Sequence, residues 1–414
     1  DANSITGNVA SIGATTGLTN NTTAFTSTAS TANNSNTVTV YAGDVGTLPA
    51  ETMTTGTLAN YNTTLSCDNG VTPSGTNGQS SNTLTIPNTV SSLITCTYTN
   101  TRKTANLIAR KTWTNAKIND VANITTTGGV NIVNFSATAN SASETDTATA
   151  ITVYAGEVLT FAESFTTGSA TNYNASLACT GNATALAGSA LTINNADTNI
   201  TCTYTNSRIA QSIRVDKQWT NSVTGHTASV TTTGGTNNPT FSSTAPTNTT
   251  GTAVTVYAGD VVTLPAETFG GGGSAIGYNT TVACTGGSTL ASGTTGRTLT
   301  ITNSTTATIC TYNNTKLPTI TITKVSSGGV GSFDFTGTNG FTNQTITTVS
   351  SGVGVAGTTQ RLTAAGVSTT ITETVPYGYA LTNVACTGLG TGTATVNYST
   401  ATVTLDTNAT AATN

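Results

Sequence analysis

The chain has 414 residues, a net charge of −4, and charged side chains at only 7% of its positions, against about a quarter in an average globular protein. A net negative chain lacks the basic face that nucleic acids need, and no apolar run approaches the length of a membrane span, so we expect neither nucleic-acid binding nor a transmembrane segment. With one histidine and few carboxylates, we predict that the protein is not an enzyme and that it holds no metal and no cofactor.

Threonine supplies 106 of the 414 residues, and the many β-branched and aromatic side chains argue against a disordered chain. Short runs alternate apolar residues with threonine, as in Asn-Thr-Leu-Thr-Ile at 82–86 and Ala-Thr-Val-Thr-Leu at 401–405. A period of two predicts strands with one buried face, and no helical period competes with it. We therefore predict an all-β fold.

Internal repeats divide the chain, because three segments return with a period of about 106 residues. The run Val-Tyr-Ala-Gly-acid-Val begins at Val40, Val153 and Val256. A Tyr-Asn run that leads to a cysteine begins at Tyr61, Tyr173 and Tyr278, and a Cys-Thr-Tyr strand begins at Cys96, Cys202 and Cys310. A unit of this size suits one immunoglobulin-like sandwich of about seven strands.

We predict a tandem array of four Ig-like β-sandwich domains. Their expected bounds are 1–103, 104–208, 209–315 and 316–414. The links between the units are short and polar, too brief to act as flexible tethers. The fourth unit is a different subtype, with Gly-rich turns and the run Ile-Thr-Glu-Thr-Val-Pro-Tyr-Gly-Tyr at 371–379.

Six of the seven cysteines form one pair per unit in the first three units. The predicted disulfides are Cys67–Cys96, Cys179–Cys202 and Cys284–Cys310. The recurrence of the pairs, without Cys-x-x-Cys spacing or a histidine partner, favours disulfides over metal ligation. Disulfides predict an extracellular protein, and buried free thiols in a cytosolic protein are the alternative.

The seventh cysteine, Cys386, is expected to be unpaired or joined to another chain. The first unit opens with a segment that corresponds to 118–129, so it lacks the opening strand that the second unit has at 107–113, and the fourth unit lacks a closing Cys-Thr-Tyr strand. Three interpretations stay open: the chain is a window cut from a longer repeat protein, a strand crosses between subunits that join end to end, or a stable unit lacks a strand. An open sheet edge invites strand addition in each case.

A lysine lies on the apolar face of three opening strands. The faces are Leu107, Ala109, Lys111 and Trp113; Ile213, Val215, Lys217 and Trp219; and Ile320, Ile322 and Lys324. Because a buried ammonium is costly, we expect each lysine to be neutralised, paired or chemically consumed.

An asparagine and a glutamate recur in register with these lysines. Asparagine follows the Cys-Thr-Tyr run at Asn100, Asn206 and Asn314, and glutamate recurs at Glu51, Glu163, Glu267 and Glu373. Together they form the set needed for a self-generated isopeptide bond, in which a neutral amine attacks a carboxamide while the acid moves protons. The complete sets are Lys111, Glu163, Asn206 and Lys217, Glu267, Asn314; the incomplete ones are Glu51, Asn100 and Lys324, Glu373. The alternative is that each lysine reaches the sheet rim or pairs with the glutamate, with asparagine as a turn residue.

Several other recurring or rare residues have simpler interpretations. The acids Asp44, Glu157 and Asp260 are expected to cap the turn after Tyr-Ala-Gly rather than to bind calcium. The two tryptophans are expected to pack in the core, and His226 is expected in a surface loop.

The run at 371–379 resembles the glutamate-containing box and the Pro-x-Gly-Tyr turn of the prealbumin-like, collagen-adhesin B-type and pilin-subunit domains of bacterial surface proteins. Tyr-Thr-Asn-Thr in the closing strands resembles the same family. The match is best in 316–414 and partial in the earlier units, and one disulfide per unit is not general in that family. The resemblance implies prealbumin-like sandwiches.

The resemblance also implies a structural protein at the outer surface of a bacterium. We expect a subunit or segment of a fibre, filament or stalk, assembled as a homopolymer through end-to-end contacts. The alternative is a cell-surface adhesin whose loops bind a host or matrix ligand that the sequence does not identify.

Overall fold

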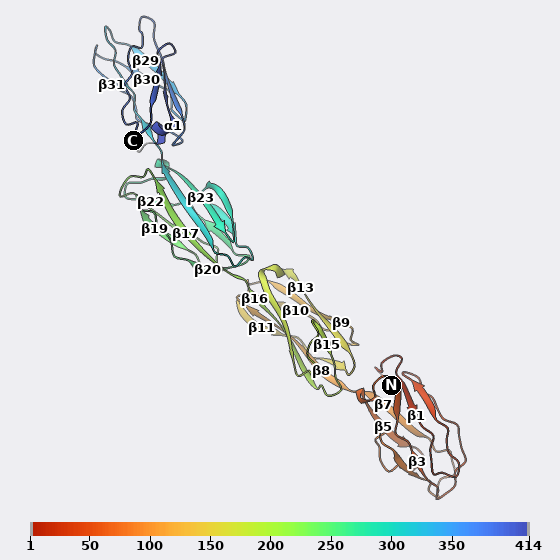
Figure 1. Cartoon of the computed structure of the whole chain (residues 1–414). Helices are drawn as coiled ribbons and strands as arrows, with labels where there is room; N and C mark the ends of the chain where they lie inside the picture. The colour runs from red at the N-terminus through yellow and green to blue at the C-terminus, as the bar shows by residue number, and fades with distance from the viewer. Residues whose placement is uncertain (1–2, 412–414) are drawn as a thin grey trace. The chain divides into compact units, whose positions relative to one another are not determined.

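The structure is a computed structural model that describes residues 3–411. It confirms the all-β prediction and the tandem array of β-sandwich domains (Figure 1). The chain divides into two compact units, one that ends at Arg208 and one that begins at Ile209, and each contains two sandwiches. Within the described residues the only α-helix is α1 (Thr407–Ala411).

The first sandwich is built from short strands. They are β1 (Val9–Ile12), β2 (Phe25–Thr28), β3 (Val45–Leu48), β4 (Thr52–Thr55), β5 (Tyr61–Cys67), β6 (Asn82–Thr85) and β7 (Cys96–Arg102), with a 3₁₀ turn η1 (Leu58–Asn60) before β5. The sheet orders are β2-β1-β4, β3-β6 and β5-β7. Leu65 and Leu84 lie in its core, as their alternation with threonine predicts.

The second sandwich has two well-formed sheets, in the orders β10-β9-β13-β15 and β11-β8-β16-β14, with β12 also paired to β8. The strands are β8 (Thr104–Thr114), β9 (Val121–Thr127), β10 (Asn134–Thr138), β11 (Ser143–Thr147), β12 (Ile151–Tyr154), β13 (Val158–Thr167), β14 (Tyr173–Thr180), β15 (Ala190–Thr192) and β16 (Asn199–Arg208), with η2 (Ala170–Asn172). Every second side chain of β8 from Ala105 to Trp113 is buried, so its apolar face lies on the core.

The third sandwich repeats this arrangement, with sheets β20-β17-β26-β23-β24, β19-β18-β22 and β21-β25. The strands are β17 (Ala210–Thr220), β18 (Thr227–Thr231), β19 (Thr240–Thr244), β20 (Val254–Tyr257), β21 (Val261–Leu264), β22 (Thr268–Gly270), β23 (Tyr278–Gly286), β24 (Leu290–Thr294), β25 (Arg297–Thr300) and β26 (Thr308–Lys316), with η3 (Ala275–Gly277).

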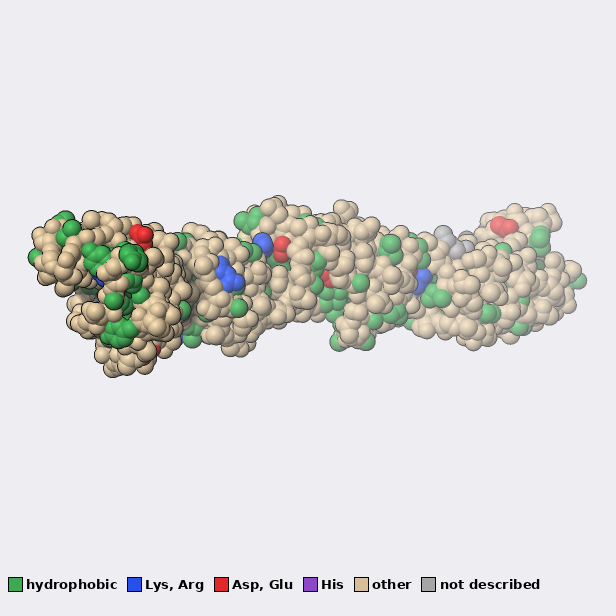
Figure 2. All heavy atoms as spheres, turned by 90° about the horizontal axis from the view of Figure 1, so that it is seen from above, with side chains coloured by type: hydrophobic (Ala, Val, Ile, Leu, Met, Phe, Trp, Pro, Cys, Tyr) green, Lys and Arg blue, Asp and Glu red, His purple; other side chains and the backbone are tan. Residues whose placement is uncertain are grey.

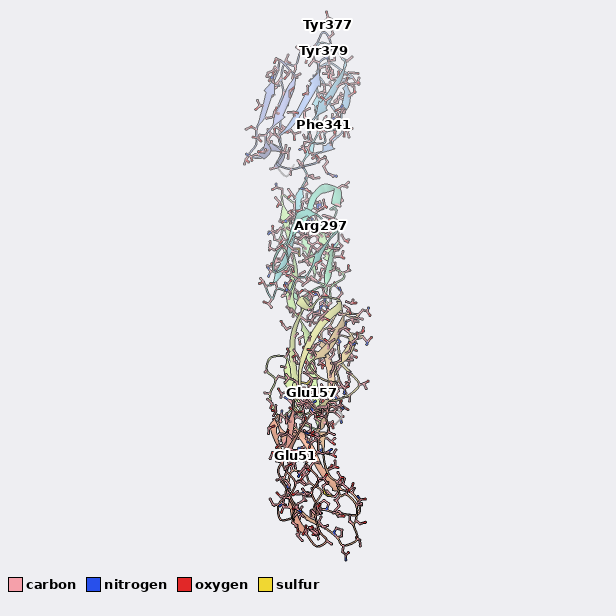
Figure 3. The ribbon with its side chains drawn as sticks, turned by 90° about the vertical axis from the view of Figure 1, so that its right-hand side faces the viewer. Glu51, Glu157, Arg297, Phe341, Tyr377 and Tyr379 are labelled. Atoms are coloured by element: carbon pink, nitrogen blue, oxygen red, sulfur yellow. A yellow bond between two sulfur atoms is a disulfide. The ribbon has the colours of Figure 1, made fainter. Side chains whose placement is uncertain are left out.

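The fourth sandwich has one five-stranded sheet, β30-β29-β33-β35-β34, and the short pairs β27-β32 and β28-β31. The strands are β27 (Thr319–Ile320), β28 (Thr323–Lys324), β29 (Ser332–Gly337), β30 (Gln344–Thr347), β31 (Val355–Ala356), β32 (Gln360–Arg361), β33 (Thr369–Thr374), β34 (Ala394–Asn397) and β35 (Thr402–Leu405). After β33 the chain reaches the exposed Tyr377, and then Tyr379, which packs on Phe333 with ring centroids 5.1 Å apart (Figure 3).

The first and last strands of the second and third sandwiches lie side by side and run parallel. In the ladder of β8 with β16, Lys111 lies opposite Tyr204 and Trp113 opposite Asn206. In the ladder of β17 with β26, Lys217 lies opposite Tyr312 and Trp219 opposite Asn314. Because side chains of one parity share a face, this pairing brings the lysine and the asparagine of each sandwich to the same face of one sheet.

Charged side chains are few and scattered on the face shown in Figure 2, in keeping with their 7% share of the sequence. No helix within residues 3–411 has the length and hydropathy needed to cross a bilayer. The described part of the chain also holds no group of three or more His, Cys, Asp or Glu side chains placed to bind a metal ion.

Candidate functional site

The second sandwich contains a cluster of a fully buried lysine, a fully buried asparagine and a glutamate whose side chain is 9% exposed. Lys111 on β8 and Asn206 on β16 are both 0% exposed. The Lys111 Nζ lies 2.7 Å from Glu163 Oε1 on β13. The Asn206 Nδ2 donates to both oxygens of the same carboxylate at 3.1 Å. One carboxylate therefore holds the amine of the first strand and the carboxamide of the last.

The third sandwich brings together the corresponding residues. The Lys217 Nζ lies 3.1 Å from Glu267 Oε1, and both side chains are completely buried. The same Nζ donates to the backbone carbonyls of Gln218 and Tyr312. Asn314 is also 0% exposed, and the hydrogen bond between its side chain and Glu267 opposes the rise in the pKa of that acid.

Tryptophan forms one wall of each cluster. The Lys111 Nζ lies 4.3 Å from the ring centroid of Trp113, and the Lys217 Nζ lies 4.5 Å from that of Trp219. The sequence interpretation of these rings as core packing is therefore incomplete, because each ring also faces the amine. The recurring Lys-x-Trp spacing is the signal that could have shown this, since positions two apart in a strand share a face.

Burial changes the protonation of these groups. It lowers the pKa of Lys111 and that of Lys217 to about 8, against the opposing effect of the nearby glutamates. Burial also raises the pKa of Glu267, against the opposing effect of Lys217. Both changes favour the uncharged forms of the two groups. The free-energy difference between the ion pair and the neutral pair, a neutral amine beside a protonated acid, is therefore smaller here than in water. That neutral pair is the form that amide exchange needs.

The fourth sandwich holds a lysine and a glutamate without the asparagine. The Lys324 Nζ donates to Glu373 Oε1 at 2.5 Å and lies 4.2 Å from the ring centroid of Phe333. Phe333 takes the place that tryptophan has in the other two clusters.

The first sandwich holds the opposite half, a glutamate and an asparagine without the lysine. The Asn100 Nδ2 donates to Glu51 Oε1 at 2.8 Å, and Thr63 Oγ1 donates to Asn100 Oδ1 at 2.6 Å. Glu51 is 3% exposed, and its Oε2 is buried without a hydrogen-bond partner among the described residues. Burial raises the pKa of this acid, against the lowering effect of its hydrogen bonds with Asn100 and Thr63.

Three disulfides join the cysteines that the repeat groups into pairs. They are Cys67–Cys96, Cys179–Cys202 and Cys284–Cys310, each with a Cα–Cα distance of 4.0 Å. In every case the two residues lie directly opposite each other on neighbouring antiparallel strands. Each disulfide therefore ties the closing strand to the antiparallel strand beside it. Cys386 is exposed and forms no disulfide within residues 3–411.

The turn acids and the histidine lie outside these clusters. The carboxylates of Asp44, Glu157 and Asp260 accept hydrogen bonds from the backbone N–H three residues before them, as expected of turn-capping residues. Figure 3 labels Glu157 together with Glu51. His226 lies in a loop, as expected, but it is only half exposed, because its Nδ1 lies 2.7 Å from the hydroxyl of Tyr278.

Comparison with known proteins adds a family match for one part of the chain. Residues 320–414 match the family model of a prealbumin-like fold domain. The resemblance to prealbumin-like domains of bacterial surface proteins is thereby confirmed for the fourth sandwich. No curated protein matches the chain.

Three solved structures illustrate what the chain is similar to. The major pilin protein T-13 of Streptococcus pyogenes is 11% identical, with 51% of this chain and 97% of that chain covered and a TM-score of 0.27. The pilus adhesin SpaC of Lactobacillus rhamnosus GG is 12% identical, with 89% and 49% covered and a TM-score of 0.21. The TIE protein of Bacillus anthracis is 10% identical, with 90% and 64% covered and a TM-score of 0.28.

Proposed function

We propose that the chain is a structural subunit or segment of a fibre, filament or stalk on the outer surface of a bacterium. The observation that carries this proposal is the parallel pairing of the first and last strands around a buried Lys–Glu–Asn cluster. The family match of the fourth sandwich supports the assignment to surface proteins. The three disulfides support an extracellular location.

The strand pairing gives the proposal a mechanical basis. The chain enters the second sandwich at the start of β8 and leaves at the end of β16, which runs parallel to it. A pull on the two ends therefore loads the whole ladder in shear. A bond between Lys111 and Asn206 would carry this load directly from strand to strand, so that the rest of the sandwich is not extended. A covalently closed first-to-last strand pair suits a protein that must endure force rather than catalyse a reaction.

We propose that the two complete clusters form isopeptide bonds. The neutral lysine Nζ attacks Cγ of the asparagine, the new C–N bond forms, the bond from Cγ to Nδ2 breaks, and ammonia leaves. The glutamate takes a proton from the amine and gives one to the leaving group, so it ends as it began. Contact of amine and carboxamide with one carboxylate supplies the high effective concentration that so slow an exchange needs.

The intact mass of the purified protein is expected to be lower than that of the reduced sequence by about 17 Da for each bond, the mass of the ammonia released by amine attack. The variants Glu163→Gln and Glu267→Gln should each restore one such loss, because the proton carrier is removed. Glu51→Gln is the matched control and should leave both of these mass losses in place, since neither complete cluster contains Glu51. An unchanged mass in the native chain, after reduction of the disulfides, would exclude the bonds.

The rate of bond formation is expected to fall above pH 8. Below pH 8 the lysine and the glutamate of a cluster carry one titratable proton between them, on either the amine or the carboxyl group. This proton is lost as the pH rises past the lowered lysine pKa of about 8. Without it no acid remains to protonate the leaving nitrogen. The test follows the mass loss of freshly translated chain in buffers from pH 6 to 10. A rate that kept rising to pH 10 would contradict the role of the glutamate.

We further propose that the chain assembles end to end into a homopolymer and that its domain bounds are 1–103, 104–208, 209–315 and 316–414. Electron microscopy of the purified protein is expected to show long uniform fibres whose axial repeat corresponds to one chain. Dispersed single chains at all concentrations would exclude self-assembly. The alternative of an adhesin receives no specific support from the described residues.

A further inference from the structure

The turn at 154–157 is one of the three Tyr-Ala-Gly-acid runs of the sequence, and it connects β12 to β13 in the second sandwich. It contacts the end of β7 in the first sandwich, and both sandwiches belong to the compact unit that ends at Arg208. Strand β7 ends at Arg102, and one residue, Lys103, separates it from β8. The joint between the two sandwiches is therefore formed by a one-residue link and this turn.

Arg102 is bound by groups of both sandwiches, and it is only 6% exposed. Its Nε donates to the carbonyl oxygen of Ala155 at 2.7 Å. Its Nη1 donates to the carbonyl oxygen of Asn3 at 3.2 Å and lies 3.7 Å from Glu157 Oε1. The central carbon of the guanidinium lies 5.5 Å from the ring centroid of Tyr154. A planar guanidinium can form these bonds and face an aromatic ring at the same time, which a lysine ammonium cannot do.

The link residue is hydrogen-bonded on both sides. The N–H of Lys103 donates to the carbonyl oxygen of Asn60 in the first sandwich at 2.9 Å, and its carbonyl oxygen accepts from the N–H of Ala155 in the second at 2.9 Å. Across the joint, Asn3 Nδ2 donates to the hydroxyl of Tyr154 at 2.8 Å. Rotation of one sandwich against the other would therefore break backbone hydrogen bonds as well as the contacts of Arg102.

The glycine of the turn allows the close approach of the two sandwiches. Gly156 has a φ of +85°, and a Cβ at this position would lie 2.7 Å from Asn60 Nδ2 and 3.0 Å from Ile5 Cδ1. A larger residue would both strain the turn and push it away from the first sandwich.

The acid of the turn has two roles at the joint. The carboxylate of Glu157 accepts hydrogen bonds from the backbone N–H groups of Tyr154 at 2.9 Å and Val130 at 3.0 Å, which fixes the shape of the turn. It also supplies the negative charge that Arg102 faces, and both side chains are buried. Since a buried charge is costly without a partner, separation of the two sandwiches at this joint would leave each charge unpaired.

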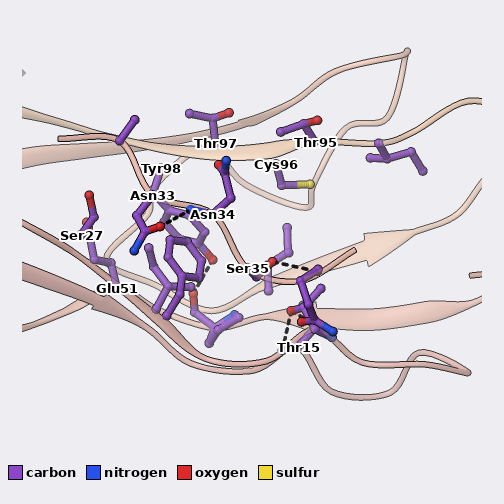
Figure 4. Close-up of a pocket in the computed structure, with 18 of the residues that line it drawn as sticks. Thr15, Ser27, Asn33, Asn34, Ser35, Glu51, Thr95, Cys96, Thr97 and Tyr98 are labelled. Atoms are coloured by element: carbon purple, nitrogen blue, oxygen red, sulfur yellow. Dashed lines mark hydrogen bonds between the residues drawn. The ribbon is translucent and has the colours of Figure 1, made fainter. Parts of the chain in front are cut away.

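The joint is distinct from the open groove of about 950 Å³ in the first sandwich (Figure 4). Glu51 and Tyr98 line that groove, whereas Asn3, Asn60 and Arg102 do not. The contacts of Arg102 are therefore a property of the joint alone.

We infer that Arg102 locks the first and second sandwiches into one rigid body and that the Tyr-Ala-Gly-Glu turn is the site that binds it. Domains of one chain are expected to move relative to each other unless their interface is extensive. Here a small interface has the same effect, because one buried arginine bonds to groups of both sandwiches. The inference is independent of the isopeptide bonds and of end-to-end assembly, since neither contributes to this joint.

Distances between two spin labels in the full 414-residue chain test the lock. The labels are attached to a ketone-bearing amino acid introduced at Thr85 and at Thr145, because the chain already contains seven cysteines. Both positions are exposed, one in each sandwich. Pulsed electron paramagnetic resonance is expected to give one narrow distance distribution for the native chain. Arg102→Ala should widen this distribution at least about twofold, because the two sandwiches then move independently.

Two further variants distinguish the lock from general stability. Tyr154→Ala removes the ring over the guanidinium and the hydrogen bond from Asn3 while it leaves Arg102 in place, and it should also widen the distribution. Arg110→Ala is the matched control: it removes the same charge from an exposed position of β8 and should leave the distribution unchanged.

Amide hydrogen exchange gives a second measurement at the joint itself. The N–H groups of Lys103 and Ala155 bond to Asn60 and Lys103. In Arg102→Ala they should exchange at least about 10-fold faster than in the native chain, because opening of the joint no longer separates a buried ion pair. Arg110→Ala should leave their exchange rates unchanged.

Two results would overturn the inference. One is a native distance distribution as wide as that of Arg102→Ala, and the other is an equal widening by Arg110→Ala. If Arg102→Ala unfolds the first sandwich, Tyr154→Ala decides: a narrow distribution in that variant would overturn the inference, and a widened one would support it.

Discussion

Substituting Glu267→Gln is expected to lower the free energy of unfolding of the third sandwich by at least about 3 kcal/mol, the usual cost of breaking a buried ion pair. The side chains of Lys217 and Glu267 are both completely buried, so the substitution leaves an ammonium without a compensating charge. It also removes the proton carrier of the proposed bond to Asn314. Denaturant unfolding followed by the fluorescence of Trp219, in a Trp113→Phe background, measures the effect in this sandwich, because the chain has only two tryptophans.

Strand β17, which carries Lys217, offers a matched control. Arg214 and Asp216 form an ion pair at 3.1 Å, and the arginine side chain is 37% exposed. Arg214→Ala is expected to cost less than about 1 kcal/mol, as exposed pairs do. Lys217→Met removes the charge and the proposed bond together and should cost less than Glu267→Gln. A Glu267→Gln variant within about 1 kcal/mol of the native chain would show that the cluster does not stabilise the sandwich.

Substituting Trp113→Ala is expected to destabilise the second sandwich by about 3–5 kcal/mol, the usual range for deleting a large buried aromatic side chain. Trp113 is 1% exposed, and its ring makes edge contacts with Phe165 and Tyr173. It also forms the wall against which the Lys111 amine is held. Calorimetry should show the melting temperature of this sandwich lowered by at least about 12 °C.

Trp113→Phe keeps an aromatic face toward Lys111 and removes less volume, so it should cost less than half as much. An exposed aromatic residue serves as the control. Tyr377 projects into solvent, so Tyr377→Ala should leave the free energy of unfolding unchanged. If Trp113→Ala and Tyr377→Ala had equal effects, the ring would not be part of the core that this structure describes.

The fold class could be predicted because its determinants are local. Apolar residues alternate with threonine, as in Asn82–Thr85, and the buried positions of β8 follow that alternation. The repeat supplied the number of sandwiches without any knowledge of packing. The irregular course of residues 33–40 could not be predicted from this pattern, because Val38 and Val40 alternate like the residues of β12 but pair with no strand among residues 3–411. A strand exists only where a neighbour accepts its hydrogen bonds.

The members of the candidate clusters could also be identified from the sequence. Lys111 and Lys217 stand out because a lysine on an apolar face breaks the pattern of a strand. The environment of each cluster could not be predicted: Asn206 donates to both oxygens of its glutamate, and in the third sandwich the Lys217 Nζ donates to two backbone carbonyls as well as facing its glutamate. Such differences depend on the positions of atoms in facing sheets, which similar sequences do not encode.

The sequence by itself determined that this protein is a β-sandwich array, which cysteines are equivalent, and which few ionisable residues recur in register. Only the tertiary structure decided which of these residues meet. Lys217 and the backbone of Tyr312 are 95 positions apart and come into contact because the first strand of a sandwich pairs with the last. In the first sandwich the last strand, β7, pairs only with β5 among the described residues. Pairing between distant strands depends on the whole sandwich, and no local pattern of residues specifies it.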